Sequence, residues 1–331
     1  MRPLFDRWPA LRQNTPIVEL GTFPTPAHAL PKLGAAWGLD LYVKRDDVTG
    51  EAFGGNKVRK LEFLFGDVRA RADRIWTYAV TGSNWAVAVA YYGKRLGIPV
   101  DLLLFKRPLN PYLENNVALA RRFARSTTIT RSVVTIPFHG AVQKLRGGRA
   151  YIMPPGGSSA LSTLGYINAG LELADQIRHG DIPRPDIVVA ALGTGGTLAG
   201  ILAGLRLAGL DAAVIGVRVA DRIVSNATFT ARIARRAAAL LARRSGDPAA
   251  AVRFSIRDFR VVHDFIGRGY GIPTPAGDEA TREFQELEGL HAESTYTAKA
   301  LAGLKALAPT LPKGARVLFW LTCNSRPTDT L

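Results

Sequence analysis

The segment Phe53-Gly-Gly-Asn-Lys-Val-Arg-Lys60 carries the residue types best suited to chemistry in this chain. Gly54 and Gly55 have no Cβ atom, so the backbone can approach a flat ligand closely at this point. Lys57 opens a stretch with helical spacing of apolar residues, and burial of such a lysine lowers the pKa of its amine. A neutral lysine amine attacks a carbonyl group and forms a Schiff base. Taken alone, however, the motif more often marks a solvated lysine at the start of a helix.

A second glycine-rich loop has the features of a phosphate-binding turn. Its residues are Gly193, Thr194, Gly195, Gly196 and Thr197. The loop follows an apolar run of strand length and precedes a helical stretch, so its free amides and the helix dipole favour an anion. It lacks the third glycine of a dinucleotide fingerprint and the Lys-Ser/Thr ending of a Walker loop, which favours a monophosphate. The alternative is an ordinary tight turn between strand and helix.

Two further loops carry polar side chains that could face a ligand. Ser83 and Asn84 stand at an expected helix start, where they would act as simple caps or would contact a carboxylate or cofactor. Tyr270 lies between two glycines, and it could pack on the surface or present a phenol to a ligand ring.

The elements that position these loops are short apolar runs alternating with helical stretches. Strands are expected at 41–43, 75–80, 100–105, 150–153, 187–191, 214–219 and 317–321, and helices from 58, from 84, at 112–125, at 162–179, after 191, at 231–244 and at 296–308. This alternation predicts an α/β fold with mostly parallel sheets covered by helices. The β-branched stretch 127–135 is ambiguous. Because ligands bind at the carboxyl ends of parallel strands, the loops described above should meet there.

Composition limits the possible classes of protein. The 331 residues, 47% hydrophobic and 21% charged, indicate a soluble globular chain of one large or two ordinary domains. A single cysteine, Cys323, excludes an internal disulfide framework, and the five scattered histidines predict no protein-built metal site.

The formal net charge of +16 raises the question of nucleic-acid binding. The basic residues are spread over the chain, and those at 232–244 have the spacing of a solvated helix face, so we expect no specific nucleic-acid partner. Attraction of anionic substrates remains open. The uncharged span 187–205 is interrupted by the glycine turn, and the first residues lack a secretory signal. We therefore expect no membrane association and a cytoplasmic location.

Together, these loops resemble a known family. The chain is similar to the pyridoxal-phosphate (PLP) enzymes of the tryptophan-synthase-β fold (fold type II), specifically the 1-aminocyclopropane-1-carboxylate deaminase/D-cysteine desulfhydrase group. The resembling segments are 23–26, 41–47, 53–62, 82–84, 156–158, 193–197, 269–273 and 296–299.

The resemblance implies a role for each of these loops. Lys57 would hold pyridoxal 5'-phosphate covalently and move the Cα proton of the substrate. Asn56 would bind the phenolic oxygen of the cofactor, while Lys60, Asn84 and the 193–197 turn would hold its phosphate. Ser83 would bind the substrate carboxylate or assist proton transfer, and Tyr270 and Tyr296 would flank ring and substrate.

Two positions near the cofactor ring separate the subfamilies. Deaminase-type members carry Glu at the first position and Leu at the second, whereas desulfhydrase-type members carry Thr at both. In this chain the two positions are Thr297 and Thr322. A hydroxyl near the pyridine nitrogen stabilises the protonated form of that nitrogen less than a carboxylate does. The cofactor is then a weaker electron sink, which suits elimination of a good leaving group. We therefore expect α,β-elimination from a small β-substituted amino acid such as D-cysteine, giving pyruvate and ammonia. The alternatives are an aminocyclopropane-carboxylate deaminase, a sulfo-lyase or β-replacement enzyme, and a protein that binds PLP or a polyanion without turnover.

The family resemblance also predicts the organisation of the chain. A small mobile domain at 58–158 would be inserted into a large PLP-binding domain made of 1–57 and 159–331, and the protein would be a homodimer. The chain departs from the family pattern at Gly82, at Trp85 and at 321–324. Trp85 would either narrow the substrate pocket or pack against Tyr91 and Tyr92.

Overall fold

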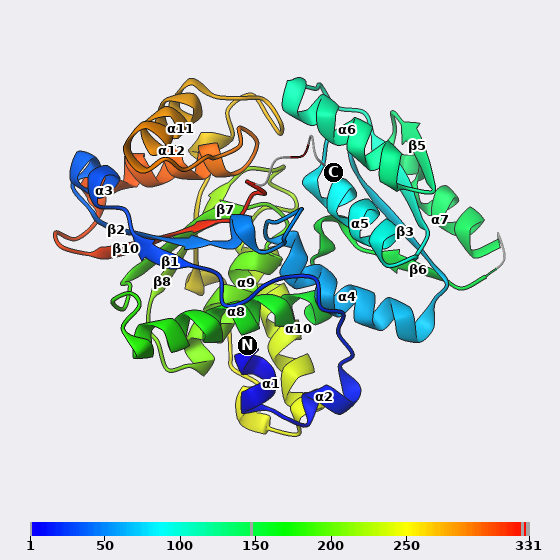
Figure 1. Ribbon diagram of the computed structural model, residues 1–331, viewed down its shortest axis with the longest axis horizontal. Helices are drawn as coiled ribbons and strands as arrows, with labels where there is room; N and C mark the ends of the chain where they lie inside the picture. The colour runs from blue at the N-terminus through cyan, green and yellow to red at the C-terminus, as the bar shows by residue number, and fades with distance from the viewer. Residues whose placement is uncertain (1, 146–147, 326–327, 329–331) are drawn as a thin grey trace.

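The strands of the computed structural model, which describes residues 2–145, 148–325 and 328, form two sheets (Figure 1). The larger has six strands in the order β1-β2-β10-β7-β8-β9. The edge pair β1–β2 is antiparallel and the other pairs are parallel. The strands are β1 (Ala27–Ala29), β2 (Asp40–Arg45), β7 (Ile187–Leu192), β8 (Ala213–Arg218), β9 (Phe259–Val262) and β10 (Arg316–Leu321).

Helices cover both faces of this sheet, which explains why its interior strands β7, β8 and β10 are mostly apolar. Leu318 and Trp320 pack with the helices of one face, whereas Val317 and Phe319 pack with those of the other. One layer is α1 (Pro3–Arg7), α2 (Leu11–Asn14), α8 (Ala160–His179), α9 (Gly196–Leu207) and α10 (Ala227–Ser245), and the other is α3 (Pro31–Trp37), α11 (Pro275–Glu288) and α12 (Thr297–Leu307). Alternating side chains on both faces are what a buried parallel sheet requires.

The smaller sheet is fully parallel and has the order β5-β4-β3-β6. Its strands are β3 (Arg74–Val80), β4 (Val100–Phe105), β5 (Ser126–Thr130) and β6 (Ala150–Met153). The helices around it are α4 (Lys57–Arg71), α5 (Asn84–Arg95), α6 (Pro111–Phe123) and α7 (Ile136–Leu145). Short 3-10 turns occupy 46–48, 133–135, 155–157, 248–250, 256–258, 264–266 and 308–310.

Helix α4 lies between the two sheets because buried charges fix it to the larger one. The Arg59 guanidinium donates to Asp46 and to Glu172 at 2.8–3.0 Å, and Lys44 donates to Glu172 at 2.6 Å. All four side chains are buried. Burial opposes ionisation of Glu172, yet Arg59 and Lys44 hold the pKa of its carboxyl at about 2. The network therefore sets the position of the helix that begins with Lys57.

The predicted α/β class is confirmed, and the predicted strands lie within about two residues of those observed. The ambiguous stretch at 127–135 contains β5 and a 3-10 turn. The basic segment 231–244 lies in α10, whose Arg232, Arg235 and Arg236 are exposed while Ala234 and Leu241 are buried. The elements that were not predicted are strands β1 and β9 and helices α1, α2, α3, α7 and α11. Within the part of the chain that the structure describes, no helix has the length and apolar character to cross a membrane.

Candidate active site

The glycine pair places Lys57 at the start of α4 through close backbone contacts. Gly55 has a φ of +92°, and a Cβ there would lie 3.1 Å from the carbonyl oxygen of Thr322. Its own carbonyl accepts a hydrogen bond from Thr49 Oγ1 at 2.9 Å, and Asn56 N donates to Thr322 O at 2.8 Å. Burial lowers the pKa of Lys57 to about 8. About a tenth of this amine is thus neutral at pH 7, far more than at the ordinary lysine pKa, and the neutral form is the nucleophile.

The turn at residues 193–197 connects β7 to α9, as predicted. Gly195 has a φ of +82° and caps α9, so the helix N-terminus opens toward the pocket. Thr194 Oγ1 shares a hydrogen bond with Ser158 Oγ at 2.6 Å. A Cβ on Gly196 would lie 2.7 Å from Ser158 Oγ, so a side chain there would fill the cradle. The turn therefore presents two hydroxyls and a helix N-terminus to the same space.

Lys60 adds an amine to this cradle. It lies one turn after Lys57 on α4, and its Nζ is 3.2 Å from Ser158 Oγ and 3.4 Å from Gly156 O. The pKa of Lys60 is well below its ordinary value because burial removes the ammonium from water and Lys57 adds a second positive charge nearby. A phosphate bound here would restore the favourable environment for that ammonium. The donor set fits the phosphate of PLP.

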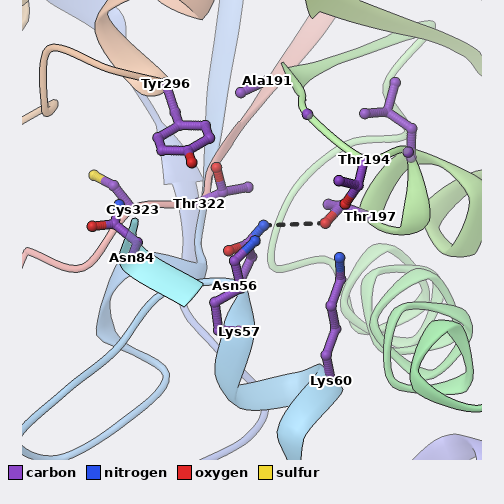
Figure 2. Close-up of a pocket in the computed structure, with 13 residues that line it drawn as sticks. Asn56, Lys57, Lys60, Asn84, Ala191, Thr194, Thr197, Tyr296, Thr322 and Cys323 are labelled. Carbon is purple, nitrogen blue, oxygen red and sulfur yellow. Dashed lines mark hydrogen bonds between the residues drawn. The ribbon is translucent and has the colours of Figure 1, made fainter. Parts of the chain in front are cut away.

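The lysine loop and the turn line one hollow of about 460 Å³, including open solvent (Figure 2). Its walls are Asn56, Lys57, Lys60, Asn84, Ala191, Gly193, Thr194, Gly195, Thr197, Leu198, Tyr296, Thr322 and Cys323. Asn56 Nδ2 donates to Thr197 Oγ1 at 3.1 Å and so joins the two loops directly. Most of the predicted cofactor residues therefore share a single pocket.

A second hollow of about 720 Å³ adjoins the first, since both are lined by Lys57, Gly193, Thr194 and Tyr296. Its other lining residues are Ala79, Val80, Ser83, Trp85, Arg107, Pro155, Gly156, Ala220, Asp221, Val224 and Tyr270. The predicted catalytic residues Ser83 and Tyr270 thus lie on the side of Lys57 that has room for a small substrate.

The two predicted tyrosines form a pair at the boundary between these hollows. Tyr270 and Tyr296 share a hydrogen bond between their hydroxyls, with ring centroids 5.6 Å apart and an interplanar angle of 81°. Burial raises the pKa of both phenols, so they remain protonated at neutral pH. Lys299 holds the Tyr270 loop, because its Nζ donates to Ile266 O at 2.8 Å and to Gly269 O at 2.9 Å.

Two predicted residues lie differently from their expected roles. Figure 2 shows Asn84 across the pocket from Thr194 and Lys60, and its Oδ1 accepts from Tyr112 OH at 2.7 Å. Asn84 therefore lines the same hollow as Lys60 and Thr194, on its opposite wall. Thr297 does not line either hollow among the described residues, and its Oγ1 accepts from the backbone N–H of Glu293 at 3.0 Å.

Sequence reasoning missed Glu293 and gave Ser158 no role. The Glu293 carboxylate is buried and accepts hydrogen bonds from the backbone N–H groups of Thr295, Tyr296 and Thr297 at 2.7–2.9 Å. It thereby fixes the start of α12 and the backbone of Tyr296. A glutamate four residues before a helical run is a weak signal, because nothing in the sequence marks it as buried.

Trp85 forms part of the wall of the second hollow. Its Nε1 donates to Thr77 Oγ1 at 3.0 Å, and the side chain is buried. A Cβ on Gly157 would lie 2.4 Å from the Trp85 ring, so the loop at 156–157 closes against it. Trp85 also belongs to the buried apolar cluster that contains Tyr92, so its position is compatible with both roles that the sequence left open.

The fold and site define an α/β protein in which a buried lysine of lowered pKa lies beside a phosphate cradle. A family model described as "Pyridoxal-phosphate dependent enzyme" matches residues 18–322. The chain belongs to this family and is an enzyme that uses pyridoxal 5'-phosphate.

Individual relatives agree with this assignment. A D-cysteine desulfhydrase of Salmonella paratyphi A is 35% identical over 300 residues, which is 87% of each chain. A Thermotoga maritima protein, provisionally named a 1-aminocyclopropane-1-carboxylate deaminase, is 32% identical over 292 residues, covering 87% of this chain and 90% of that relative. The solved structure of an ACC deaminase homologue has a TM-score of 0.82 and 30% identity, covering 99% of this chain and 97% of that one.

Proposed function

We propose that this enzyme catalyses α,β-elimination on a small β-substituted amino acid such as D-cysteine, giving pyruvate, ammonia and the released β-group. The observation that carries this proposal is the position of Lys57, whose amine faces both the phosphate cradle and the adjoining hollow. The name of the Salmonella relative and the threonine at position 322 also support it.

The proposed roles follow from the geometry of the side chains. The bound cofactor supplies the electron sink for the charge left at Cα. Lys57 removes the Cα proton, Ser83 at the N-terminus of α5 receives the substrate carboxylate, and the protonated phenol of Tyr270 faces the substrate.

For the cofactor, we propose that Lys60 and the 193–197 turn hold its phosphate, while Asn56, which is joined to the turn through Thr197, binds its phenolic oxygen. Asn84, on the other side of the pocket, would face the ring instead of the phosphate. Thr322 lines the hollow directly. Thr297 would influence the cofactor ring indirectly, through its hydrogen bonds with Glu293 and Cys323.

The organisation of the chain is part of the same proposal. Residues 58–158 contain the whole four-stranded sheet and would form the small mobile domain. Residues 1–57 and 159–331 contribute the six-stranded sheet and would form the large domain. We further propose a cytoplasmic homodimer, which sedimentation analysis of the purified protein would test.

Product analysis tests the reaction. The purified holoenzyme is incubated with D-cysteine, L-cysteine and 1-aminocyclopropane-1-carboxylate. Pyruvate with equimolar ammonia and sulfide from a cysteine is the expected result. Formation of 2-oxobutanoate from the cyclopropane substrate alone would instead establish the deaminase, which the names of the Thermotoga relative and the solved homologue favour.

A further inference from the structure

The first turn of α6 packs against both loops that carry the side chains proposed to face the substrate. Its residue Leu113 is buried, and a Cβ on Gly82 would lie 2.5 Å from Leu113 Cβ. A Cβ on Gly271 would lie 2.7 Å from Leu113 Cδ1. Gly82 immediately precedes Ser83, and Gly271 immediately follows Tyr270. The departure from the family pattern at Gly82 thus makes room for the start of α6 between the two loops.

Asn110 connects the start of α6 to the Tyr270 loop through both ends of its side-chain amide. Its Oδ1 accepts a hydrogen bond from Leu113 N at 2.9 Å and so caps the helix. Its Nδ2 donates to Gly271 O at 2.9 Å. Asn110 follows β4 of the four-stranded sheet, whereas the Tyr270 loop follows β9 of the six-stranded sheet. One side chain therefore joins the two parts of the chain beside the substrate hollow.

The carbonyl groups on either side of Tyr270 are held by side chains from these two parts. Lys299 on α12 donates to Gly269 O at 2.9 Å, and Asn110 donates to Gly271 O. Gly269 and Gly271 have φ values of +145° and +76° and no Cβ to restrict the backbone. The position of the Tyr270 phenol therefore depends on both hydrogen bonds.

The Ser83 loop is fixed to α6 by a second set of contacts. Asn116 Nδ2 donates to Gly82 O at 2.9 Å and to Asn84 Oδ1 at 2.7 Å. Tyr112 OH donates to the same Asn84 oxygen at 2.7 Å. Because α6 is thus tied to the backbone around Ser83, the Asn110 amide extends this framework to Tyr270.

We propose that Asn110 is a positioning residue, which sets the place of the Tyr270 phenol relative to Ser83. The proposal rests on the function described above, in which Ser83 receives the substrate carboxylate and Tyr270 faces the substrate. Without the N–H donor of Asn110, the Tyr270 loop can shift relative to α6, while the contacts of Ser83 and of the phosphate cradle remain. Misplacement of one group by about 1 Å can cost about 100-fold in rate. The expected signature is a fall in kcat with a smaller change in KM.

Asn110→Asp separates positioning from folding. Aspartate caps a helix about as well as asparagine, but its carboxylate has no N–H to donate to Gly271 O. Steady-state kinetics of the holoenzyme, with the amino acid that product analysis identifies, should show kcat lowered at least about tenfold and KM changed less than about 3-fold. The urea midpoint of unfolding should stay unchanged. Asn110→Ser, which keeps a capping hydroxyl too short to reach Gly271, should behave alike without a new charge.

Asn115→Asp is the matched control. This exposed asparagine lies on the same helix and donates to Thr328 Oγ1 at 3.0 Å, and the change introduces the same charge as Asn110→Asp. It should alter neither kcat nor KM. An equal loss of kcat in Asn115→Asp and Asn110→Asp would overturn the inference, because the added charge alone would then explain both.

Tyr270→Phe tests whether Asn110 acts through the phenol. If it does, adding Asn110→Asp to Tyr270→Phe should lower kcat less than about 2-fold further, since the group that Asn110 positions is already absent. Losses that multiply would show a general structural role and would overturn the inference. So would an unaltered kcat in Tyr270→Phe beside a reduced kcat in Asn110→Asp.

Hydrogen exchange of the holoenzyme separates this inference from the proposed reaction. Backbone amides at 267–273 should exchange at least about 3-fold faster in Asn110→Asp than in wild type, whereas those of α10 should not change. If no amino acid is turned over but exchange at 267–273 rises, the elimination fails and the link from Asn110 to the Tyr270 loop stands. Unchanged exchange at 267–273 would overturn the inference whatever the substrate.

Discussion

The side-chain amide of Asn56 donates a hydrogen bond to the hydroxyl of Thr197 at 3.1 Å, across a sequence separation of 141 residues. Asn56 immediately precedes the lysine proposed to bind the cofactor aldehyde, and Thr197 lies in the turn proposed to bind its phosphate. This hydrogen bond thus connects the two loops that we propose hold opposite ends of the same molecule.

Thr197→Val removes this hydrogen bond while keeping the shape of the side chain. We expect the Kd for pyridoxal 5'-phosphate to rise about 3- to 10-fold, since a neutral hydrogen bond contributes about 1 kcal/mol. Titration of the coenzyme-free protein with pyridoxal 5'-phosphate, followed by visible absorbance, measures this Kd. Thr228→Val, an exposed change on α10, is the control and should leave the Kd unchanged. Equal Kd values for both variants would show that the Asn56–Thr197 bond has no role in cofactor binding.

The pKa of Lys57 predicts how cofactor capture depends on pH. The neutral amine is the nucleophile, and burial lowers its pKa to about 8 from 10.5. The capture rate of the coenzyme-free protein should therefore rise about tenfold per pH unit below pH 8 and level off above it. Nα-acetyl-lysine, with an ordinary pKa of about 10.4, is the control and should keep rising beyond pH 9. A protein profile that matched this control would contradict the burial of Lys57, and capture unaffected by Lys57→Ala would refute its assignment.

Arg59→Met should destabilise the fold strongly. Asp46 and Glu172 would keep their negative charges in a buried site with Lys44 as the remaining cation of the network. We expect the free energy of unfolding to fall by about 3–5 kcal/mol in urea denaturation. Arg71→Met, on the same helix, removes the pair of the exposed Arg71 guanidinium with the mostly buried Asp67 carboxylate, which Tyr151 still contacts, and should cost less than about 1 kcal/mol. Similar losses for the two variants would show that the buried network does not stabilise α4.

Lys299→Met should impair turnover more than cofactor binding. The change removes the two hydrogen bonds that hold the backbone of the Tyr270 loop, whereas the phosphate cradle lies elsewhere. We expect kcat to fall at least about tenfold, with the Kd for the cofactor changed less than about 2-fold. Lys305→Met on the same helix breaks half-exposed pairs with Glu279 and Glu283 and is the control. An unaltered kcat in Lys299→Met would show that the loop keeps its position without this lysine.

The sequence was sufficient for most of the fold because buried parallel strands appear as uninterrupted apolar runs. The run at 187–191 lies within β7, and that at 75–80 lies within β3. Strand β9 was missed since it has four residues at a sheet edge, of which Phe259 alone is buried. Helix α11 was missed because its buried face consists of Gly277, Ala280 and Phe284, too sparse a stripe to stand out.

The site was predictable where function depends on backbone geometry and less so where it depends on distant contacts. The glycine loops gave Lys57 and the turn at 193–197, and the structure brings them into one pocket. The contacts of Ser158 with Lys60 and of Arg107 with Asp221 join residues that are far apart in the sequence. Glu293 caps the nearby helix α12, but a glutamate is too common a residue type to reveal this role. No periodicity in a single sequence records such contacts.

Strand β10 lies in the middle of the large sheet, between β2 and β7, although it is the last strand in the chain order. The backbone just after it, at Thr322, accepts the N–H of Asn56 and thereby supports the lysine loop. During synthesis, the lysine loop and the glycine turn are both made before residues 316–322 emerge from the ribosome, so the lysine loop lacks its support from Thr322 until then. Cofactor capture should therefore be a late event in biogenesis, and nascent chains stalled before β10 should be unable to retain it.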